Sequence, residues 1–292
     1  CVLFLHGGAT LQMAMIPLNF SQKEGQAEYV NSGYWAQKAI KEARKFIQVN
    51  IAASSETSNF NFFPPQKSWQ IQSNSSYIHI TPNETIGGIR LANLERMDLP
   101  IIADYSSGIL SGPLNVGNFG VIYGGAQKNI GPAGLGFAVI RKDLLDNVQD
   151  RTPTMLNYQT YFEHSSLYNT PSTFSWYVTS KVLKWLLKLG GLEKVSTINH
   201  RKAKKLYSLI DNSDFYKNNI QESSRSIMNI PFSLEDESLN LKFLEDASKA
   251  GLLALKGHRS VGGMRASIYN AMPEEGVDSL IDFMTSFEKE NF

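Results

Sequence analysis

The chain has 292 residues, of which 42% are hydrophobic and 19% are charged, with 28 basic and 27 acidic side chains. Its length allows one large domain or two ordinary ones, and its composition excludes an intrinsically disordered chain. Because the charges nearly cancel, we expect no nucleic-acid partner, and no apolar run approaches the roughly 18 residues that a membrane span requires.

The first twenty residues are apolar, but they lack a basic leading region and are interrupted by Gly7 and Gly8. We therefore predict a strand at residues 2–5, a glycine turn and a helix from about Leu11, rather than a signal peptide. Cys1 is the only cysteine, so a disulfide framework is excluded and a cytoplasmic location is expected. The sequence starts without Met and inside this strand, so we expect that an N-terminal piece is absent.

Short apolar runs then alternate with segments of helical period, as in an α/β domain whose mostly parallel sheet is covered by helices. A surface helix is predicted from Trp35 to Phe46. Further strands rich in Ile, Val and aromatic residues are predicted at residues 77–81, 99–105, 120–123 and 136–140. These elements make residues 1–190 a large ligand-binding domain.

The composition shifts after a long helix predicted at residues 173–189, which ends at Gly190 and Gly191. The segments beyond it predict a smaller α+β domain at residues 191–292. Its predicted helices are residues 193–210, residues 241–251 and a last helix from Pro273, and its predicted strands are residues 226–232 and 264–269.

The strongest local signal for chemistry is Lys128, which lies between glycine-rich turns in YGGAQKNIGPAG. A lysine after a strand of an α/β sheet lies near the edge where such folds bind ligands. Partial burial there lowers the pKa of the amine, and a neutral amine can form a Schiff base. A loop lysine by itself is more often a solvated charge, so this interpretation needs partner residues.

Asp104 closes the apolar segment PIIAD, 24 positions before the lysine. A carboxylate in such a place can keep the pyridine nitrogen of pyridoxal phosphate protonated, which makes the ring an electron sink. An isolated Asp at a strand end is more often a helix cap or a loop acid.

The segment HGGAT at residues 6–10 has a strand, two glycines and a helix start, where backbone N–H groups and the helix dipole favour a phosphate. Trp35 opens the next helix and could stack on an aromatic ring, although tryptophan more often belongs to the core.

Lys256, His258, Arg259 and Arg265 flank a glycine-rich turn. Guanidinium groups match carboxylate and phosphate oxygens, so this cluster suits a phosphorylated amino acid, while a solvated basic patch is the plain alternative. The five histidines show no metal-ligand spacing, and no metal is expected.

Together these blocks resemble the phosphoserine aminotransferase family, in the class V branch of the fold-type I pyridoxal-phosphate enzymes. The resemblance spans nearly the whole chain and is most specific in the lysine block and the last of the following segments. They are HGGATLQMAMIPLN, SGYWAQKAIKEA, PNETIGGI, ADYSSGILS, YGGAQKNIGPAGL, NTPSTFSWY, DNSDFY and LKGHRSVGGMRASIYNAMP.

The resemblance implies pyridoxal phosphate as cofactor, with Lys128 and Asp104 as the catalytic residues and Trp35 stacked on the ring. Arg265 would bind the substrate carboxylate, and a homodimer would share its active sites. The other implied residues are Ala9, Thr10 and Gln127 at the cofactor phosphate, Thr85 near the ring hydroxyl, Asn169 and Thr170 reaching the phosphate from the neighbouring subunit, and His258 and Arg259 at the substrate phosphate.

The implied reaction is reversible amino transfer between glutamate and 3-phosphohydroxypyruvate, giving O-phosphoserine and 2-oxoglutarate in serine biosynthesis. Whether phosphohydroxythreonine, in pyridoxal phosphate biosynthesis, is a second substrate is left open by the sequence. Two departures matter. Family members carry about a fifth more chain before this start, including a His-Arg pair that helps to hold substrate, and some have Gly-Arg where this chain has Ala9 and Thr10.

Two alternatives stay open. Another class V enzyme could share the fold, but a cysteine desulfurase needs a mobile catalytic cysteine, for which Cys1 is a poor candidate. An alanine–glyoxylate aminotransferase has no need of the cationic pair His258 and Arg259. The other alternative is an inactive, N-terminally truncated form that serves dimer assembly, and such a protein would stay colourless with cofactor added.

Overall fold

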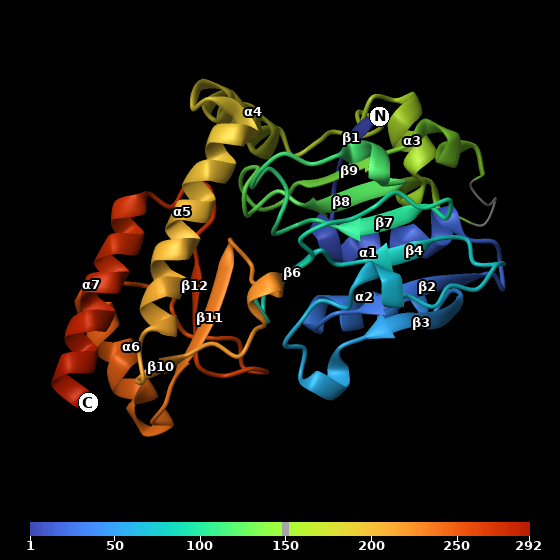
Figure 1. Cartoon of the computed structure of the whole chain (residues 1–292). Helices are drawn as coiled ribbons and strands as arrows, with labels where there is room; N and C mark the ends of the chain where they lie inside the picture. The colour runs from blue at the N-terminus through green and yellow to red at the C-terminus, as the bar shows by residue number, and fades with distance from the viewer. Residues whose placement is uncertain (148–151) are drawn as a thin grey trace.

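The computed structural model describes residues 1–147 and 152–292, and its largest element is a mostly parallel sheet (Figure 1). Neighbouring strands from β8 to β3 run parallel, whereas β9 is antiparallel to both β8 and β1. All strands except β9 therefore end at the same edge. Within the described residues the spatial order is β1 (Val2–Leu5), β9 (Gly136–Ile140), β8 (Val121–Gly125), β7 (Ile101–Asp104), β4 (Ile78–Ile80), β2 (Gln26–Asn31) and β3 (Gln48–Ser54).

One face of this sheet is covered by α1 (Gly8–Phe20), which packs on β8 and β9, and by α2 (Tyr34–Ala43), which packs on β2 and β3. Buried side chains of the strands meet Met13, Ile16 and Ile40 of these helices, and α3 (Tyr158–Glu163) extends the same core. Successive side chains of a strand point to opposite faces of the sheet, so the strand side chains that do not meet these helices lie on the opposite face. There, loop residues such as Phe63, Trp69 and Phe119 complete a second core.

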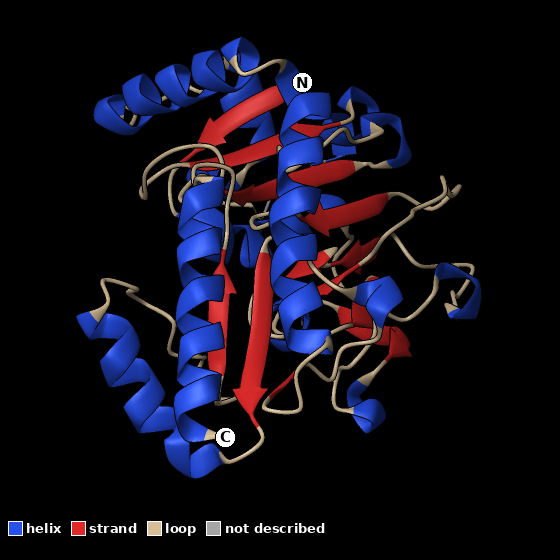
Figure 2. Cartoon of the chain, turned by 60° about the vertical axis from the view of Figure 1, so that its left-hand side comes forward, coloured by secondary structure: helices blue, strands red, loops and turns tan. Residues whose placement is uncertain are grey.

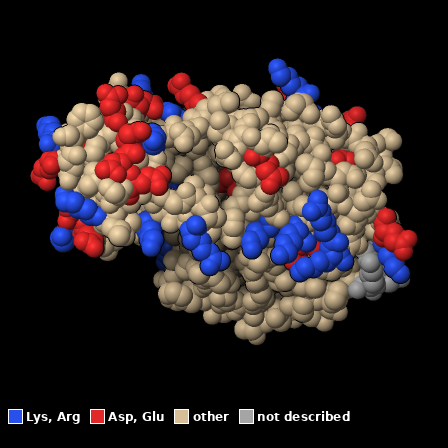
Figure 3. Space-filling model, turned by 90° about the horizontal axis from the view of Figure 1, so that it is seen from below, with Lys and Arg blue, Asp and Glu red and all other residues tan. Residues whose placement is uncertain are grey.

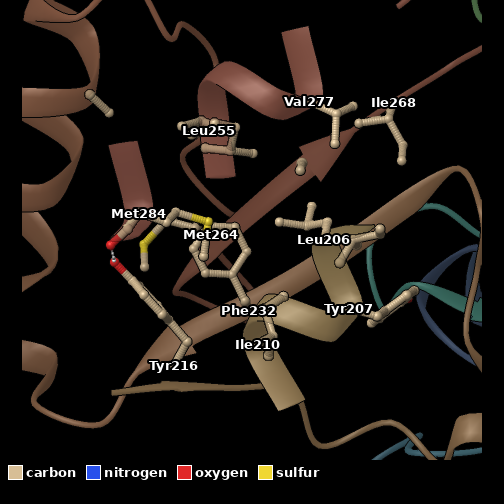
Figure 4. Close-up of a cluster of buried hydrophobic side chains, with 14 of the residues drawn as sticks. Leu206, Tyr207, Ile210, Tyr216, Phe232, Leu255, Met264, Ile268, Val277 and Met284 are labelled. Atoms are coloured by element: carbon tan, nitrogen blue, oxygen red, sulfur yellow. Dashed lines mark hydrogen bonds between the residues drawn. The ribbon is translucent and has the colours of Figure 1, made fainter. Parts of the chain in front are cut away.

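The C-terminal part has a core of its own, formed by residues between 203 and 287 (Figure 4). Its antiparallel sheet joins β10 (Tyr216–Lys217), β11 (Asn229–Leu234) and β12 (Met264–Ser267), and α4 (Thr173–Lys188) leads into it. The helices α5 (Gly191–Asp211), α6 (Asn240–Lys249) and α7 (Glu274–Asn291) complete this part, and Figure 2 shows long helices lying along the small sheet. The division of the chain at residue 190 stays a prediction, which this separate core supports.

Buried asparagines join the two parts of the chain beside the lysine loop. The side-chain oxygen of Asn129 accepts the N–H of Asn270 at 3.0 Å, and the Asn270 amide donates to the carbonyl of Leu110 at 2.9 Å. Asn199 of α5 donates to the Asn270 oxygen at 2.8 Å. Since buried amides are costly to leave unpaired, this chain of bonds fixes the residue after Lys128 against the C-terminal part.

Most predicted elements are confirmed with shifted ends. The strand at residues 136–140 matches β9, and the helix expected from Leu11 begins earlier, at Gly8. Gly190, with φ 111°, ends α4 and also precedes α5, so one glycine serves both helices. The strands β2 and β3, and the hairpin of β5 (Asn83–Glu84) and β6 (Ile89–Arg90), were not predicted.

On the face seen from below, charged side chains are scattered over a largely uncharged surface, acidic and basic groups lie next to one another in several places, and basic side chains form a row across the middle (Figure 3). None of the helices in the described residues is long and apolar enough to cross a membrane.

His79 makes the stability of the fold depend on pH. The ring is 1% exposed, bonds the hydroxyl of Tyr123 at 2.9 Å and stacks on Tyr29, with 4.8 Å between ring centroids. Burial lowers the pKa of this imidazole from 6.5 to about 3. The folded state thus keeps the ring neutral, and its contribution to stability is full above pH 6.5 and is lost as the pH falls toward 3.

We expect the wild type to lose about 2 kcal/mol more than His79→Gln between pH 7 and pH 5, because each unit below the unfolded pKa costs about 1.4 kcal/mol. Urea unfolding of both proteins at the two pH values measures this difference. Equal losses in both would contradict it.

Candidate active site

Residues at the carboxyl ends of five strands of the large sheet lie at one edge of it. Gly7 follows β1, Lys128 follows β8, Asp104 ends β7, Thr81 follows β4 and Trp35 stands soon after β2. Because these five strands end at one edge of the sheet, residues far apart in sequence meet there.

A cavity of about 360 Å³ lies at this edge. This volume is within the range of roughly 300–1,000 Å³ of small-molecule sites. It brings together seven of the residues predicted to bind a cofactor, which are Ala9, Thr10, Trp35, Thr85, Asp104, Gln127 and Lys128. Gly7 and Gly8 of the predicted phosphate turn also line it. Sequence reasoning missed the other lining residues, which are Thr81, Asn83, Ser106, Ser107, Ala133 and Gly134.

Lys128 stands in the loop between β8 and β9, which is closed by a bond from the N–H of Ala126 to the carbonyl of Leu135 at 2.9 Å. Its Nζ donates to the hydroxyl of Thr85 at 2.8 Å and lies 5.9 Å from the centroid of the Trp35 ring. Burial lowers the pKa of the amine, although the charge of Asp104 opposes this. The loop therefore presents an amine that loses its proton more easily than a surface lysine.

Asp104 is 5% exposed, and Ser106 holds one of its oxygens, Oδ1. The N–H and the hydroxyl of Ser106 donate to Oδ1 at 3.0 and 2.5 Å, while the hydroxyl accepts the N–H of Gly125 at 3.2 Å. Oδ2 accepts no hydrogen bond from any described residue. Burial raises the pKa of this carboxyl, and the bonds from Ser106 and the charge of Lys128 counteract that rise. The carboxylate thus has one fixed oxygen and one free oxygen beside the cavity.

The turn before α1 exposes free backbone donors to the cavity. Gly7 has φ 80°, and a Cβ there would lie 2.5 Å from a side-chain atom of Leu11, so only glycine fits. No side chain caps α1 and no acid stands in its first turn, which includes Ala9 and Thr10. N–H groups of a first helical turn have no partner within the helix and favour an anion. The side chain of Gln127 is exposed at the cavity rim.

Trp35 lies in the first turn of α2, with its ring edge-on to that of Tyr34 at 5.4 Å. Its backbone N–H and that of Ala36 donate to the carboxylate of Glu84. Burial raises the pKa of Glu84 to about 7, while these two N–H groups oppose the rise. Sequence reasoning missed Glu84, which has no local signal of burial.

The predicted substrate residues are only partly brought together. Arg265 of β12 is half-buried, its charge reaches Lys128 and helps to lower the pKa of that amine, and its Nε is buried without a partner among the described residues. His258 is half-buried with its ring 5.0 Å from that of Tyr34, next to Trp35. Arg259 is exposed, and none of these three residues lines the cavity itself.

Asn169 and Thr170 are also exposed and lie outside the cavity of their own chain. Large apolar side chains are exposed on both sides of them, among which Leu167, Phe174 and Tyr177 are 56%, 71% and 60% exposed. A cluster of exposed apolar residues is typical of a protein-contact surface.

Comparisons with known proteins find one family along nearly the whole chain. The sequence profile of the aminotransferase class-V family matches residues 1–280. A phosphoserine aminotransferase of Hahella chejuensis (strain KCTC 2396) is 52% identical over 291 residues, covering 99% of this chain and 81% of the relative.

Solved structures give the same result. The phosphoserine aminotransferase from Bacillus circulans subsp. alkalophilus matches with a TM-score of 0.98 at 45% identity, covering 100% of this chain and 81% of that one. The PLP-bound phosphoserine aminotransferase from Trichomonas vaginalis matches with a TM-score of 0.92 at 36% identity, covering 98% and 82%.

Proposed function

The chain belongs to the aminotransferase class-V family, and we propose from this premise that Lys128 and Asp104 are its catalytic residues. Within the family it groups with the phosphoserine aminotransferases, and it is a pyridoxal-phosphate-dependent transaminase. We infer the reversible reaction of glutamate with 3-phosphohydroxypyruvate, which gives O-phosphoserine and 2-oxoglutarate. This reaction belongs to serine biosynthesis, and we propose a cytoplasmic location for it.

The residues around the cavity fit pyridoxal phosphate. The amine of Lys128 can take the aldehyde, the free oxygen of Asp104 can take the pyridine N–H, and the indole of Trp35 offers a face for the ring. Phosphate would meet the uncapped start of α1 at Ala9 and Thr10. Gln127 would add a phosphate contact, and Thr85, which already bonds the Lys128 amine, would lie near the ring hydroxyl.

Bound pyridoxal phosphate supplies an electron-withdrawing ring next to the carbon that loses its proton. Lys128 would remove the proton from Cα of the amino acid and deliver a proton to the cofactor carbon on the other side of the amino nitrogen, because burial lowers the pKa of its amine. Asp104 would keep the pyridine nitrogen protonated, since its carboxylate is held by Ser106 and cannot turn away. Trp35 covers the amine side of the cavity and would exclude water from it.

Arg265 would bind the substrate carboxylate. Its side chain is close enough to Lys128 for its charge to affect that amine, and its buried Nε has no partner among the described residues, so an anion would satisfy it. His258 and Arg259 would bind the substrate phosphate beyond Tyr34. These three residues would place the Cα proton of a phosphorylated amino acid toward Lys128.

We also propose a homodimer with shared sites. Asn169 and Thr170 are exposed within an apolar surface and lie outside the cavity of their own chain. In a dimer that buries Leu167 and Phe174, they would reach the cofactor phosphate of the partner subunit.

The observation that carries the proposal is the cavity in which a half-buried lysine and a carboxylate with one free oxygen meet an uncapped helix start. We expect the reconstituted enzyme to accept phosphoserine as amino donor and to prefer it over serine and alanine by 100-fold or more in kcat/KM. The reason is that charge-assisted bonds to the phosphate add ~3 kcal/mol or more. Stopped-flow absorbance of the amino-transfer half-reaction measures this preference.

The variant Arg259→Ala is expected to raise KM for phosphoserine roughly tenfold and leave alanine turnover unchanged. Equal use of alanine and phosphoserine by the wild type would contradict the substrate assignment.

A further inference from the structure

Glu84, at the end of β5, is a buried carboxylate that the reaction proposed above does not use. Its side chain is 0% exposed. One oxygen accepts the N–H of Trp35 at 3.0 Å, and the other accepts the N–H of Ala36 at 2.8 Å. Helix α2 begins after Gly33, which has no side chain to cap those N–H groups. A residue 48 positions further along the chain therefore serves as the cap of α2.

The local structure is built to admit this carboxylate. A Cβ at Gly33 would lie 2.8 Å from the carboxyl carbon of Glu84, closer than side chains approach. Glycine at this position thus lets the acid reach the helix start. The helix dipole also favours a negative charge there, which offsets part of the cost of burial.

The capped residue is the one proposed to cover the cofactor ring. The indole Nε1 of Trp35 is buried and has no hydrogen-bond partner among the described residues. No side-chain bond therefore orients the ring, and its place depends on the backbone at the start of α2 and on packing against Tyr34. The next residue along the chain, Thr85, accepts a hydrogen bond from the Lys128 amine through its hydroxyl. One short segment thus fixes both the start of α2 and the catalytic amine.

We propose that Glu84 is a positioning residue, whose carboxylate holds the first turn of α2 so that Trp35 lies over the ring of the bound cofactor. This inference rests on the proposed stacking role of Trp35. Glu84 touches neither substrate nor cofactor in this account and acts through the backbone N–H groups of Trp35 and Ala36.

The sharpest variant is Glu84→Gln, which keeps the shape but leaves only one oxygen, so that its NH₂ group faces one of the two N–H donors. We expect it to weaken cofactor binding roughly tenfold, the size of a lost aromatic stacking contact. In a Trp35→Ala background, the same change should alter the cofactor Kd less than about twofold, because the two residues act as one unit. Titration of the apo-protein with pyridoxal phosphate, at a pH well above 7 so that the carboxylate is ionised, measures all four proteins.

Visible circular dichroism of the bound cofactor gives a second readout, which should fall in Glu84→Gln even at saturating cofactor. Glu28→Gln is the matched control, because Glu28 is 1% exposed and accepts bonds from Ser75 and the N–H of Gln72 far from the cavity. It should lower the free energy of unfolding without changing the cofactor Kd or dichroism. If Glu84→Gln does not fold, Gly33→Ala displaces the same carboxylate from the other side and should give the same result.

The outcomes distinguish the stacking role of Trp35 from the positioning role of Glu84. An unchanged cofactor Kd in Trp35→Ala would refute the stacking role itself. Equal weakening by Glu84→Gln with and without Trp35, or no weakening in the wild-type background, would refute the positioning role of Glu84.

Discussion

Lys128→Ala is expected to lower the rate of amino transfer from phosphoserine by about four orders of magnitude or more. The same amine is proposed to hold the cofactor and to move the Cα proton, so one substitution removes both. The position is specific because the Ala126–Leu135 bond closes the loop and Thr85 receives the amine. Single-turnover absorbance of the reconstituted variant with phosphoserine measures the loss.

Lys67→Ala is the matched control, since Lys67 is an exposed lysine in a short 3-10 helix that does not line the cavity. It should leave the rate within a factor of about two, as surface changes usually do. A Lys128→Ala enzyme that keeps a tenth of the wild-type rate would remove Lys128 from the mechanism.

Asp104→Asn is expected to lower kcat by about 10²–10³ while the cofactor still binds. An amide cannot keep the pyridine nitrogen protonated, so the ring becomes a weaker electron sink. The bonds that Ser106 donates to Oδ1 can also be accepted by the amide oxygen, so the side chain should stay in place. Steady-state kinetics together with the cofactor Kd separate lost chemistry from lost binding.

Asp98→Asn changes an exposed acid shortly before the same strand and should have little effect on either quantity. If Asp104→Asn bound the cofactor more weakly but kept the wild-type kcat, the proposed role of Asp104 in keeping the pyridine nitrogen protonated would be contradicted.

The residues that line the cavity were easier to single out from the sequence than the strands β2 and β3. Lys128, Asp104 and the HGGAT turn carry local signals, because glycines and a polar residue at a strand end have few structural uses. Ser106 carried a weaker local signal, since the side chain of an Asp can accept a hydrogen bond from the backbone N–H of the residue two positions later. Glu84 carried no local signal, because the residues whose N–H groups it accepts lie 48 and 49 positions away in the sequence. Only the fold shows why an acid is needed there.

Strand β2 shows why one end of the sheet, formed by β2 and the edge strand β3, was missed. Parallel strands are expected to be continuous apolar runs, yet all six residues of Gln26–Asn31 are buried and three of them are polar or charged. Glu28 is tolerated because Ser75, Gln72 and Asn50 donate to one of its oxygens. These partners come from other segments, so neither periodicity nor propensity could reveal them.

The antiparallel strand β9 was placed correctly along the chain, but its direction could not be predicted. Ten residues separate β8 from β9, and they hold Lys128 rather than a crossover helix. A connection of this length returns the chain beside β8 as an antiparallel neighbour. The loop that carries Lys128 is therefore tied at both ends to adjacent strands, which makes it a rigid support for the amine.

Lys202 is the strongest competitor for the cofactor among the lysines of the described residues. It is 0% exposed and burial lowers its pKa to about 8. Its amine, however, donates to the carbonyls of Ile268, Tyr269 and Met272, at 2.9 to 3.2 Å. All three protons are thus engaged, and the side chain lies away from the cavity that contains Lys128.

Borohydride reduction of the reconstituted wild type, followed by proteolysis and mass spectrometry, tests the central assignment most directly. We expect the cofactor to be fixed to the peptide that contains Lys128, and no labelled peptide from Lys128→Ala. A cofactor fixed to Lys202 or to another lysine of the wild type would contradict the account.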